Sequence, residues 1–165
     1  MKILIIYGTR RGTTTRTSEV ISSILSGEFS YETEICPLQN KRRIKRRLSE
    51  FDLVIVGSSI QAGRWVNQSR KFLKRFRHSV QPLAIFVTAG GTMNKVKKYG
   101  IHKSDATREG IEKYINKYVE KYKLNPVSKM VFGGRVVKKN VVRYDNWNEE
   151  DIKNWTRELV KMIEN

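Results

Sequence analysis

The chain has 165 residues, which is the usual size of one domain, so we expect a single domain over residues 1–165. Its 33 lysines and arginines against 16 acidic residues give a net charge of +17, which favours an acidic protein, anionic lipid or nucleic acid as partner. A single cysteine, Cys36, excludes an internal disulfide, and the apolar runs are too short for a transmembrane helix.

Predicted strands and helices alternate along the chain. The first half is predicted to form a strand over residues 2–7, a helix over 14–26, a strand over 31–36, a basic helix over 41–49 and a strand over 52–57. The second half is predicted to form a helix over 67–77, a strand over 83–87, a helix over 105–123, a strand over 129–137 and a last helix capped by Asn148. Continuous apolar runs mark strands that are buried on both faces, and apolar residues at helical spacing mark the helices. The alternation predicts an α/β fold with a parallel sheet covered on both faces.

The turn after the first predicted strand is typical of a phosphate-binding site. It reads Gly8-Thr9-Arg10-Arg11-Gly12-Thr13-Thr14 and leads directly into a predicted helix. Such a turn offers free backbone N–H groups, and the helix N-terminus adds a partial positive charge. Gly12 permits the positive φ that points successive N–H groups inward, and the three threonines add hydroxyl donors. The turn lacks the motifs of dinucleotide and triphosphate sites, so it favours a single phosphate monoester.

Two further loops are expected at the same edge of the sheet as this turn, because parallel strands end there together. The loop after the third strand reads Gly57-Ser58-Ser59-Ile60-Gln61-Ala62-Gly63-Arg64-Trp65, and the loop after the fourth reads Thr88-Ala89-Gly90-Gly91-Thr92-Met93-Asn94. Both loops are rich in glycine and short polar residues, which let backbone amides approach a flat ligand. Trp65 is expected either to stack on that ligand or to pack its own loop.

Two basic runs, residues 41–47 and 70–77, carry a large part of the excess positive charge. Both have apolar residues at the spacing of one buried helix face, so the basic side chains cover the other face. Two interpretations stay open for these runs. They form either a solvated face that keeps the protein soluble or a surface that docks an acidic partner.

These features together resemble the flavodoxin family over nearly the whole chain. The turn from Thr9 to Thr14 is similar to the phosphate loop of that family, with Arg11 in place of its middle threonine. Three ordered motifs resemble the menaquinone-dependent protoporphyrinogen oxidase type of flavodoxin domain: residues 8–14, residues 57–63 and Asp145-Asn146-Trp147. Where that type carries a long basic and hydrophobic insertion, this chain has only residues 136–145. The resemblance implies a three-layer flavodoxin-like sandwich, with a five-stranded parallel sheet in the order 2-1-3-4-5 and helices on both faces.

The resemblance also implies flavin mononucleotide (FMN) as the cofactor. The first loop would hold the phosphate through backbone N–H groups and hydroxyls, and the other two loops would lie along the flavin ring. The implied binding residues are Thr9, Arg10, Arg11, Gly12, Thr13, Thr14, Ser58, Ser59, Ile60, Gln61, Ala62, Gly63, Trp65, Thr88, Ala89, Gly90, Gly91 and Thr92. Gly63 is either the residue that permits a peptide flip beside the ring or part of a passive turn with Ala62. The positive charge is expected to raise the reduction potential above that of an acidic flavodoxin.

Three functions follow from these observations. The first is an electron carrier or small flavin oxidoreductase that works with an acidic redox partner. The second is oxidation of protoporphyrinogen IX in tetrapyrrole synthesis, with a quinone as acceptor and a peripheral contact with an anionic membrane. The third is a non-enzymatic module that uses its basic face to bind a membrane or nucleic acid, with nucleic acid as the less favoured ligand.

The sequence predicts neither a set of catalytic side chains nor a metal site. His78 and His102 are far apart along the chain and have no cysteine or carboxylate neighbours at ligand spacing. The first strand begins at the N-terminus without a signal peptide, so a cytoplasmic protein is expected, with peripheral membrane contact as an alternative.

Overall fold

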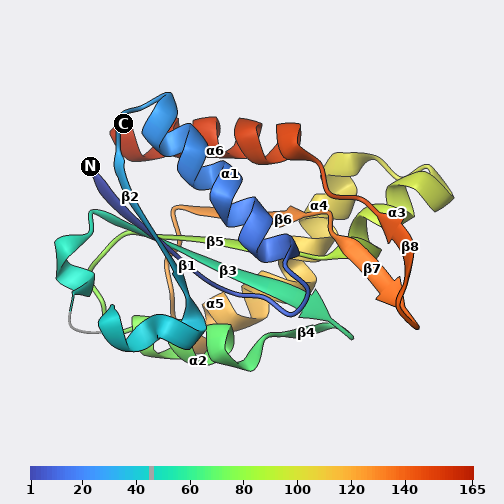
Figure 1. Ribbon diagram of the computed structural model, residues 1–165, viewed down its shortest axis with the longest axis horizontal. Coiled ribbons are helices and arrows are strands. Elements are labelled where there is room, and N and C mark those ends of the chain that lie inside the picture. Colours follow the sequence, from blue (N-terminus) through green and yellow to red (C-terminus); the bar gives the residue numbers. More distant parts are fainter. Residues whose placement is uncertain (45–46) are drawn as a thin grey trace.

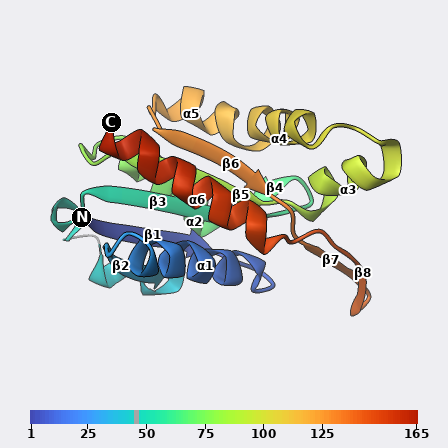
Figure 2. The same ribbon diagram turned by 90° about the horizontal axis from the view of Figure 1, so that it is seen from above.

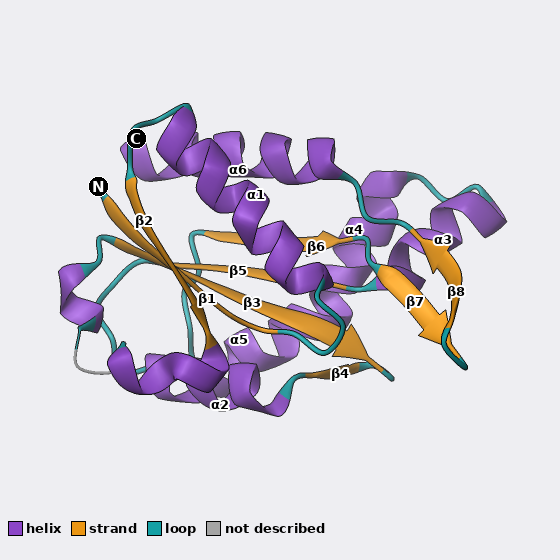
Figure 3. Ribbon diagram, in the orientation of Figure 1, coloured by secondary structure: helices purple, strands orange, loops and turns teal. Residues whose placement is uncertain are grey.

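The structure is a computed structural model that describes residues 1–44 and 47–165, and it has three layers (Figures 1 and 3). The central sheet contains β1 (Lys2–Gly8), β2 (Glu32–Pro37), β3 (Leu53–Gln61), β4 (Arg64–Trp65), β5 (Leu83–Thr88) and β6 (Ser128–Phe132). The α-helices are α1 (Thr13–Gly27), α2 (Asn67–Phe76), α3 (Gly90–Tyr99), α4 (Lys103–Ile111), α5 (Lys117–Tyr122) and α6 (Glu149–Glu164). A separate hairpin of β7 (Arg135–Lys138) and β8 (Val141–Asp145) precedes α6.

The sheet has the strand order that the sequence predicted. Its hydrogen-bonded order is β2-β1-β3-β5-β6, and all four neighbouring pairs on this path are parallel. The five expected strands therefore lie in the order 2-1-3-4-5. The short strand β4 is an addition, and it pairs antiparallel with the end of β3.

Helices cover both faces of the sheet because its central strands are apolar on both sides (Figure 2). On one face, α1 and α6 bury Ile21, Leu25 and Trp155 against the strands. On the other face, α2, α5 and the π-helical turn η3 (Glu112–Asn116) bury residues such as Phe72 and Ile115. The two cores fix the sheet between the helical layers, so the loops at its carboxyl edge stand on a rigid base.

Two of the expected helices differ from prediction. The helix expected over 105–123 is built from α4, η3 and α5, with the π-helical turn in its middle. In place of the basic helix expected over 41–49, the described part of this segment forms short 3-10 turns, η1 (Leu38–Arg43) and η2 (Leu48–Glu50). Residues 45–46 of that basic run lie outside the described residues. Ile44 nevertheless takes the expected buried position, with 1% of its surface exposed.

The strand expected over 129–137 is interrupted, and its second half, residues 135–137, is strand in a separate hairpin rather than in the central sheet. Strand β6 ends at Phe132, and the chain leaves the sheet at Gly133 and Gly134 to form the β7–β8 hairpin. A Cβ at Gly133 would lie 1.8 Å from the backbone oxygen of Asn146. The chain crosses itself so closely there that a residue with a side chain would not fit, and this crossing directs the hairpin away from the sheet.

No helix in the described part of the chain combines the length and apolar character needed to cross a membrane.

Candidate functional site

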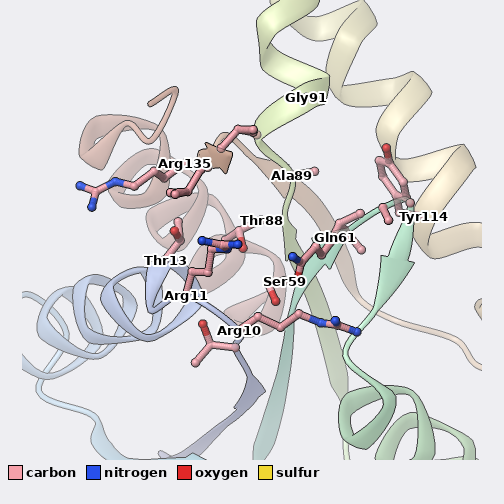
Figure 4. Close-up of a pocket in the computed structure, with 18 of the residues that line it drawn as sticks. Arg10, Arg11, Thr13, Ser59, Gln61, Thr88, Ala89, Gly91, Tyr114 and Arg135 are labelled. Atoms are coloured by element: carbon pink, nitrogen blue, oxygen red, sulfur yellow. The ribbon is translucent and has the colours of Figure 1, made fainter. Parts of the chain in front are cut away.

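A cavity of about 270 Å³ lies at the carboxyl ends of the parallel strands, where α/β proteins of this kind bind ligands. Figure 4 shows that its lining converges from segments far apart in the sequence. The lining residues are Thr9, Arg10, Arg11, Thr13, Ser59, Ile60, Gln61, Ala62, Gly63, Thr88, Ala89, Gly90, Gly91, Tyr114, Gly134, Arg135, Val136, Val137 and Tyr144. All three loops that the sequence singled out therefore contribute to one cavity.

The turn between β1 and α1 has the backbone of an anion cradle. Gly12 has a φ of 85°, in the left-handed region, and its N–H donates to the Thr9 hydroxyl at 3.0 Å. No described side chain caps the N-terminus of α1, and its first turn has no acidic residue. The first N–H groups of a helix lack partners within it, so this end of α1 can donate several hydrogen bonds to an anion.

The two threonines that follow Gly12 lie in different surroundings. Thr13 lines the cavity, as expected of a hydroxyl that contacts a ligand. The Thr14 side chain is fully buried, and its hydroxyl lies 3.0 Å from the Thr88 hydroxyl. Thr14 therefore joins the turn to the end of β5, while Thr13 is left to face the cavity.

The end of β3 offers one unpaired hydroxyl. The Ser58 hydroxyl is buried, accepts a hydrogen bond from the Val66 N–H at 3.1 Å and donates to the Ser59 carbonyl. The Ser59 hydroxyl is also buried but has no hydrogen-bond partner among the described residues, and Ser59 lines the cavity. An unpaired buried hydroxyl is costly, so a polar group of a ligand bound against this wall would stabilise it.

Ala62 and Gly63 form the tight turn between β3 and β4. Ile60 pairs with Trp65 and Gln61 with Arg64, which leaves two residues in the turn. Their φ values are 48° and 72°, as in the two-residue hairpin turns that suit twisted strands. Both residues line the cavity, and the two interpretations of Gly63 stay open, because a peptide flip would take place within this same turn.

The expectation that Trp65 stacks on the ligand is not met. Only 3% of its surface is exposed, and it is not among the residues that line the cavity. Its Nε1–H donates to the Tyr114 carbonyl at 2.7 Å, and its ring meets Tyr118 edge-on. The antiparallel pairing of β4 with β3 turns this side chain into the core, which corresponds to the packing alternative.

The loop expected over 88–94 is shorter than predicted because α3 begins at Gly90. Thr88, Ala89, Gly90 and Gly91 line the cavity, so the start of this segment has the expected place. Thr92 is buried and lies outside the lining, and its side chain lies close to Gly110 of α4.

Sequence reasoning missed two contributors to the cavity. The β7–β8 hairpin supplies one wall through Arg135, Val136, Val137 and Tyr144, and η3 supplies Tyr114. The Gly133-Gly134 pair was a local signal for a break after β6. Tyr114 had no such signal, because it sits within an ordinary helical pattern and only the tertiary fold carries it to the cavity.

The third motif, Asp145-Asn146-Trp147, packs beside the phosphate-type turn. The guanidinium carbon of Arg16 lies 3.6 Å from the centre of the Trp147 ring, and Trp147 Nε1–H donates to the Thr17 hydroxyl at 3.1 Å. Asp145 accepts from the Trp147 N–H at 3.1 Å and pairs with Arg135 at 3.3 Å. The motif therefore braces the first turns of α1 and the base of the hairpin.

Positive charge dominates the described lining. It contains three arginines, Arg10, Arg11 and Arg135, and none of its residues is acidic. In Figure 4 the side chains of Arg10 and Arg11 extend in different directions, and the Arg135 guanidinium points away from the other labelled residues. No group of three or more histidine, cysteine or carboxylate residues able to hold a metal ion occurs in the described chain. The arrangement suits an anionic organic ligand.

Comparisons with known proteins agree with the fold. The archaeal "Structure of a flavodoxin from the domain Archaea" has a TM-score of 0.61 at 14% identity, with 100% of both chains covered. Oxidised flavodoxin 2 from Bacillus cereus has a TM-score of 0.61 at 15% identity, with 98% of this chain and 99% of that chain covered. Rubredoxin:oxygen oxidoreductase from Desulfovibrio gigas has a TM-score of 0.59 at 14% identity, and the match covers 99% of this chain but 36% of that one.

A search of curated protein sequences gives no match. The family profile described as "Flavodoxin domain" matches residues 4–161, which is nearly the whole chain and includes every segment that lines the cavity. Proteins of that family bind FMN, in agreement with the cofactor expected from the sequence. The chain belongs to the flavodoxin domain family.

Proposed function

We propose that this protein binds FMN in the cavity at the carboxyl edge of the sheet and works as an electron carrier or small flavin oxidoreductase. The observation that carries the proposal is one cavity lined by two features. One is the buried Ser59 hydroxyl, which has no partner among the described residues, and the other is the start of α1, whose N-terminus no described side chain caps. The hydroxyl can bond to a polar group of a ligand, and the helix N-terminus favours an anion. A phosphorylated ligand with a polar chain between phosphate and ring meets both requirements.

The residues present fit FMN. The N–H groups at the start of α1, the Thr13 hydroxyl and the Arg11 guanidinium would hold the phosphate. The Ser59 hydroxyl would bond to a polar group of the ligand, and Gly91, where a Cβ would have no heavy atom closer than 3.9 Å, leaves room for a flat ring. When bound, FMN supplies the redox chemistry, and the protein supplies position and electrostatics.

The sign of the charge supports an acidic redox partner and a raised reduction potential. The lining contains Arg10 and Arg11 in addition to Arg135, which Asp145 partly neutralises, and the whole chain carries +17. A positive surrounding favours the more negative, reduced form of a bound cofactor. We expect the potential of bound FMN to lie above that of acidic flavodoxins, as measured by potentiometric titration of the loaded protein.

Oxidation of protoporphyrinogen is a second candidate. Val136 and Val137 line the same cavity as Arg10 and Arg11, a combination that suits a substrate with an apolar macrocycle and carboxylates. An assay with FMN-loaded protein, protoporphyrinogen and a quinone tests it. Turnover that depends on the protein would favour this candidate, whereas an FMN-loaded protein without turnover would leave the electron carrier.

The absorption spectrum of the purified protein and a titration with FMN test the main proposal. Protein that carries flavin, or that quenches FMN fluorescence with one site per chain, is the expected result. Riboflavin, which lacks the phosphate, should bind more weakly. Failure to bind either flavin would overturn the proposal and would favour a module that binds anions through its basic surface.

A further inference from the structure

The β7–β8 hairpin has a fixed root and a free tip. At the root, the Asn146 N–H donates to the Gly134 carbonyl at 3.1 Å, and the Asn146 amide donates to the Gly90 carbonyl at 3.2 Å. A Cβ at Gly90 would lie 2.6 Å from Val136, so the root also packs tightly against the start of α3. In Figures 1 and 2 the hairpin extends beyond the ends of the parallel strands.

The tip of the hairpin is basic, and its charges are not neutralised within the described chain. Lys138, Lys139 and Arg143 are exposed and form no ion pair with any described residue. The one acidic residue of the hairpin, Asp145, is already paired with Arg135 near the root. Lys139 holds a φ of 50° in the two-residue turn, a conformation in which asparagine and glycine are the usual residues. The turn thus presents a lysine at its end.

Two apolar side chains lie among these cations. Val141 and Val142 are 54% and 50% exposed, although most branched apolar side chains of this chain are buried. Interfaces between proteins typically combine a small apolar contact with a surrounding polar rim. The tip has this composition.

Two further cations come from elements other than the hairpin, in or beside the cavity lining. Arg10 lines the cavity from the phosphate-type turn, and Arg64 is exposed on β4 beside Gln61 of the lining. Neither arginine forms an ion pair with a described residue. The hairpin tip, Arg10 and Arg64 therefore border the opening with positive charge from separate elements.

We propose that the hairpin tip, together with Arg10 and Arg64, docks a negatively charged redox protein over the mouth of the cavity. This inference rests on the proposed function, because the cavity is then the place where electrons enter or leave. The tip extends beyond the turn that carries Arg10, so a flat bilayer that meets the tip would stand away from that turn (Figure 1). A rounded acidic protein surface can reach both the tip and Arg10 at once, and opposite charge would speed its approach.

The chain offers a matched control for the test. The hairpin variant combines Lys138→Glu, Lys139→Glu and Arg143→Glu, none of which lines the cavity. The control variant combines Lys71→Glu, Lys74→Glu and Arg75→Glu on α2, in the second basic run of the sequence. Both variants change the net charge equally, but only the first changes it beside the cavity.

The probe is a strongly acidic plant-type [2Fe–2S] ferredoxin, and its binding to the FMN-loaded protein is measured by isothermal titration calorimetry at two salt concentrations. We expect the hairpin variant to raise the Kd at least about tenfold at low salt and the control variant to change it far less. Added salt should weaken wild-type binding more than binding of the hairpin variant. A glutamine version of the hairpin variant removes the three charges without reversing them. Its Kd should lie between those of the wild-type protein and the glutamate variant, which would show that charge and not misfolding causes the loss.

Several outcomes would overturn the docking proposal. They are wild-type protein that does not bind the ferredoxin, equal loss of binding in both variants, and no loss in the hairpin variant. Loss of binding to phosphatidylserine vesicles without loss of ferredoxin binding would assign the tip to a membrane instead. An FMN titration of each variant measures cofactor binding independently of docking, so the docking proposal and the proposed function can fail separately. A protein that binds no FMN refutes the cofactor site, while calorimetry of the unloaded protein still decides where the acidic protein docks.

Discussion

The Thr14 hydroxyl, in the first turn of α1, lies 3.0 Å from the Thr88 hydroxyl at the end of β5, although 74 residues separate them along the chain. Both side chains are buried, so this hydrogen bond is shielded from water. It ties the helix that begins at the phosphate-type turn to the strand that leads into the Ala89–Gly91 side of the cavity. Two loops far apart in sequence are thereby held in one site.

Thr14→Val tests this link. Valine keeps the shape but leaves the buried Thr88 hydroxyl without its partner, so the free energy of unfolding should fall by about 1–3 kcal/mol. The double variant Thr14→Val/Thr88→Val should lose less than the sum of the two single variants, because no unpaired hydroxyl remains. Urea denaturation measures all three, and strictly additive losses would contradict the hydrogen bond.

Ser59→Ala should weaken FMN binding without lowering the stability of the protein that carries no ligand. Without ligand, removal of an unpaired buried hydroxyl should leave the free energy of unfolding unchanged or higher. The Kd for FMN should rise by up to about tenfold, the value of one hydrogen bond. Ser58→Ala is the matched control: it removes the acceptor of the Val66 N–H and should lower stability. If Ser59→Ala left FMN affinity intact, Ser59 would not contact the ligand.

Arg11→Gln should weaken FMN binding by on the order of tenfold or more, because a charge-assisted hydrogen bond to the phosphate is lost. Its effect on riboflavin should be small, since riboflavin carries no phosphate. Arg143→Gln removes the same charge outside the cavity lining and should change neither affinity much. Equal losses for FMN and riboflavin would show that Arg11 acts on the ring or on folding rather than on the phosphate.

Gly90 has no room for a side chain, whereas its neighbour Gly91 has room for a methyl group. A Cβ at Gly90 would lie 2.6 Å from Val136 and 2.9 Å from the Gly134 carbonyl, whereas at Gly91 the nearest atom is 3.9 Å away. Gly90→Ala should therefore cost about 1–3 kcal/mol of stability and loosen the hairpin. Gly91→Ala should be tolerated, because alanine favours a helix. Thermal denaturation together with limited proteolysis of the hairpin distinguishes these results.

Tyr31 gives the fold a sensitivity to alkaline pH. Its hydroxyl donates to the Glu164 carboxylate, and chiefly this hydrogen bond raises the pKa of Tyr31 from 10.0 to about 12. A raised pKa means that the folded state holds the proton more tightly, so the contribution is complete below pH 10 and is lost as pH rises toward 12. Wild-type protein should lose more stability over that range than Tyr31→Phe. Parallel pH profiles of the two proteins would contradict the link.

Several features of the site could be predicted because their causes are local. Gly12 takes the left-handed φ that its position in the turn required, and uncapped N–H groups follow directly at α1. The continuous apolar runs identified the central strands β1, β3 and β5, since only strands buried on both faces tolerate such runs. Trp65 shows where this reasoning ends: its pairing through β4 decided between ligand and core, and no local pattern encodes that choice.

The sequence by itself determined the alternation of strands and helices, the phosphate-type turn and the flavodoxin family, because these depend on apolar periodicity and on glycine and threonine at fixed spacing. Only the tertiary structure decided that Thr14 faces Thr88 while Ser59 faces the cavity. It also decided that residues 135–145 leave the sheet as a hairpin with a basic tip. The physical reason is the close crossing of Gly133 and Asn146. Each of the two segments, taken alone, has a pattern that fits either a continuing strand or a hairpin, and only their contact decides between the two.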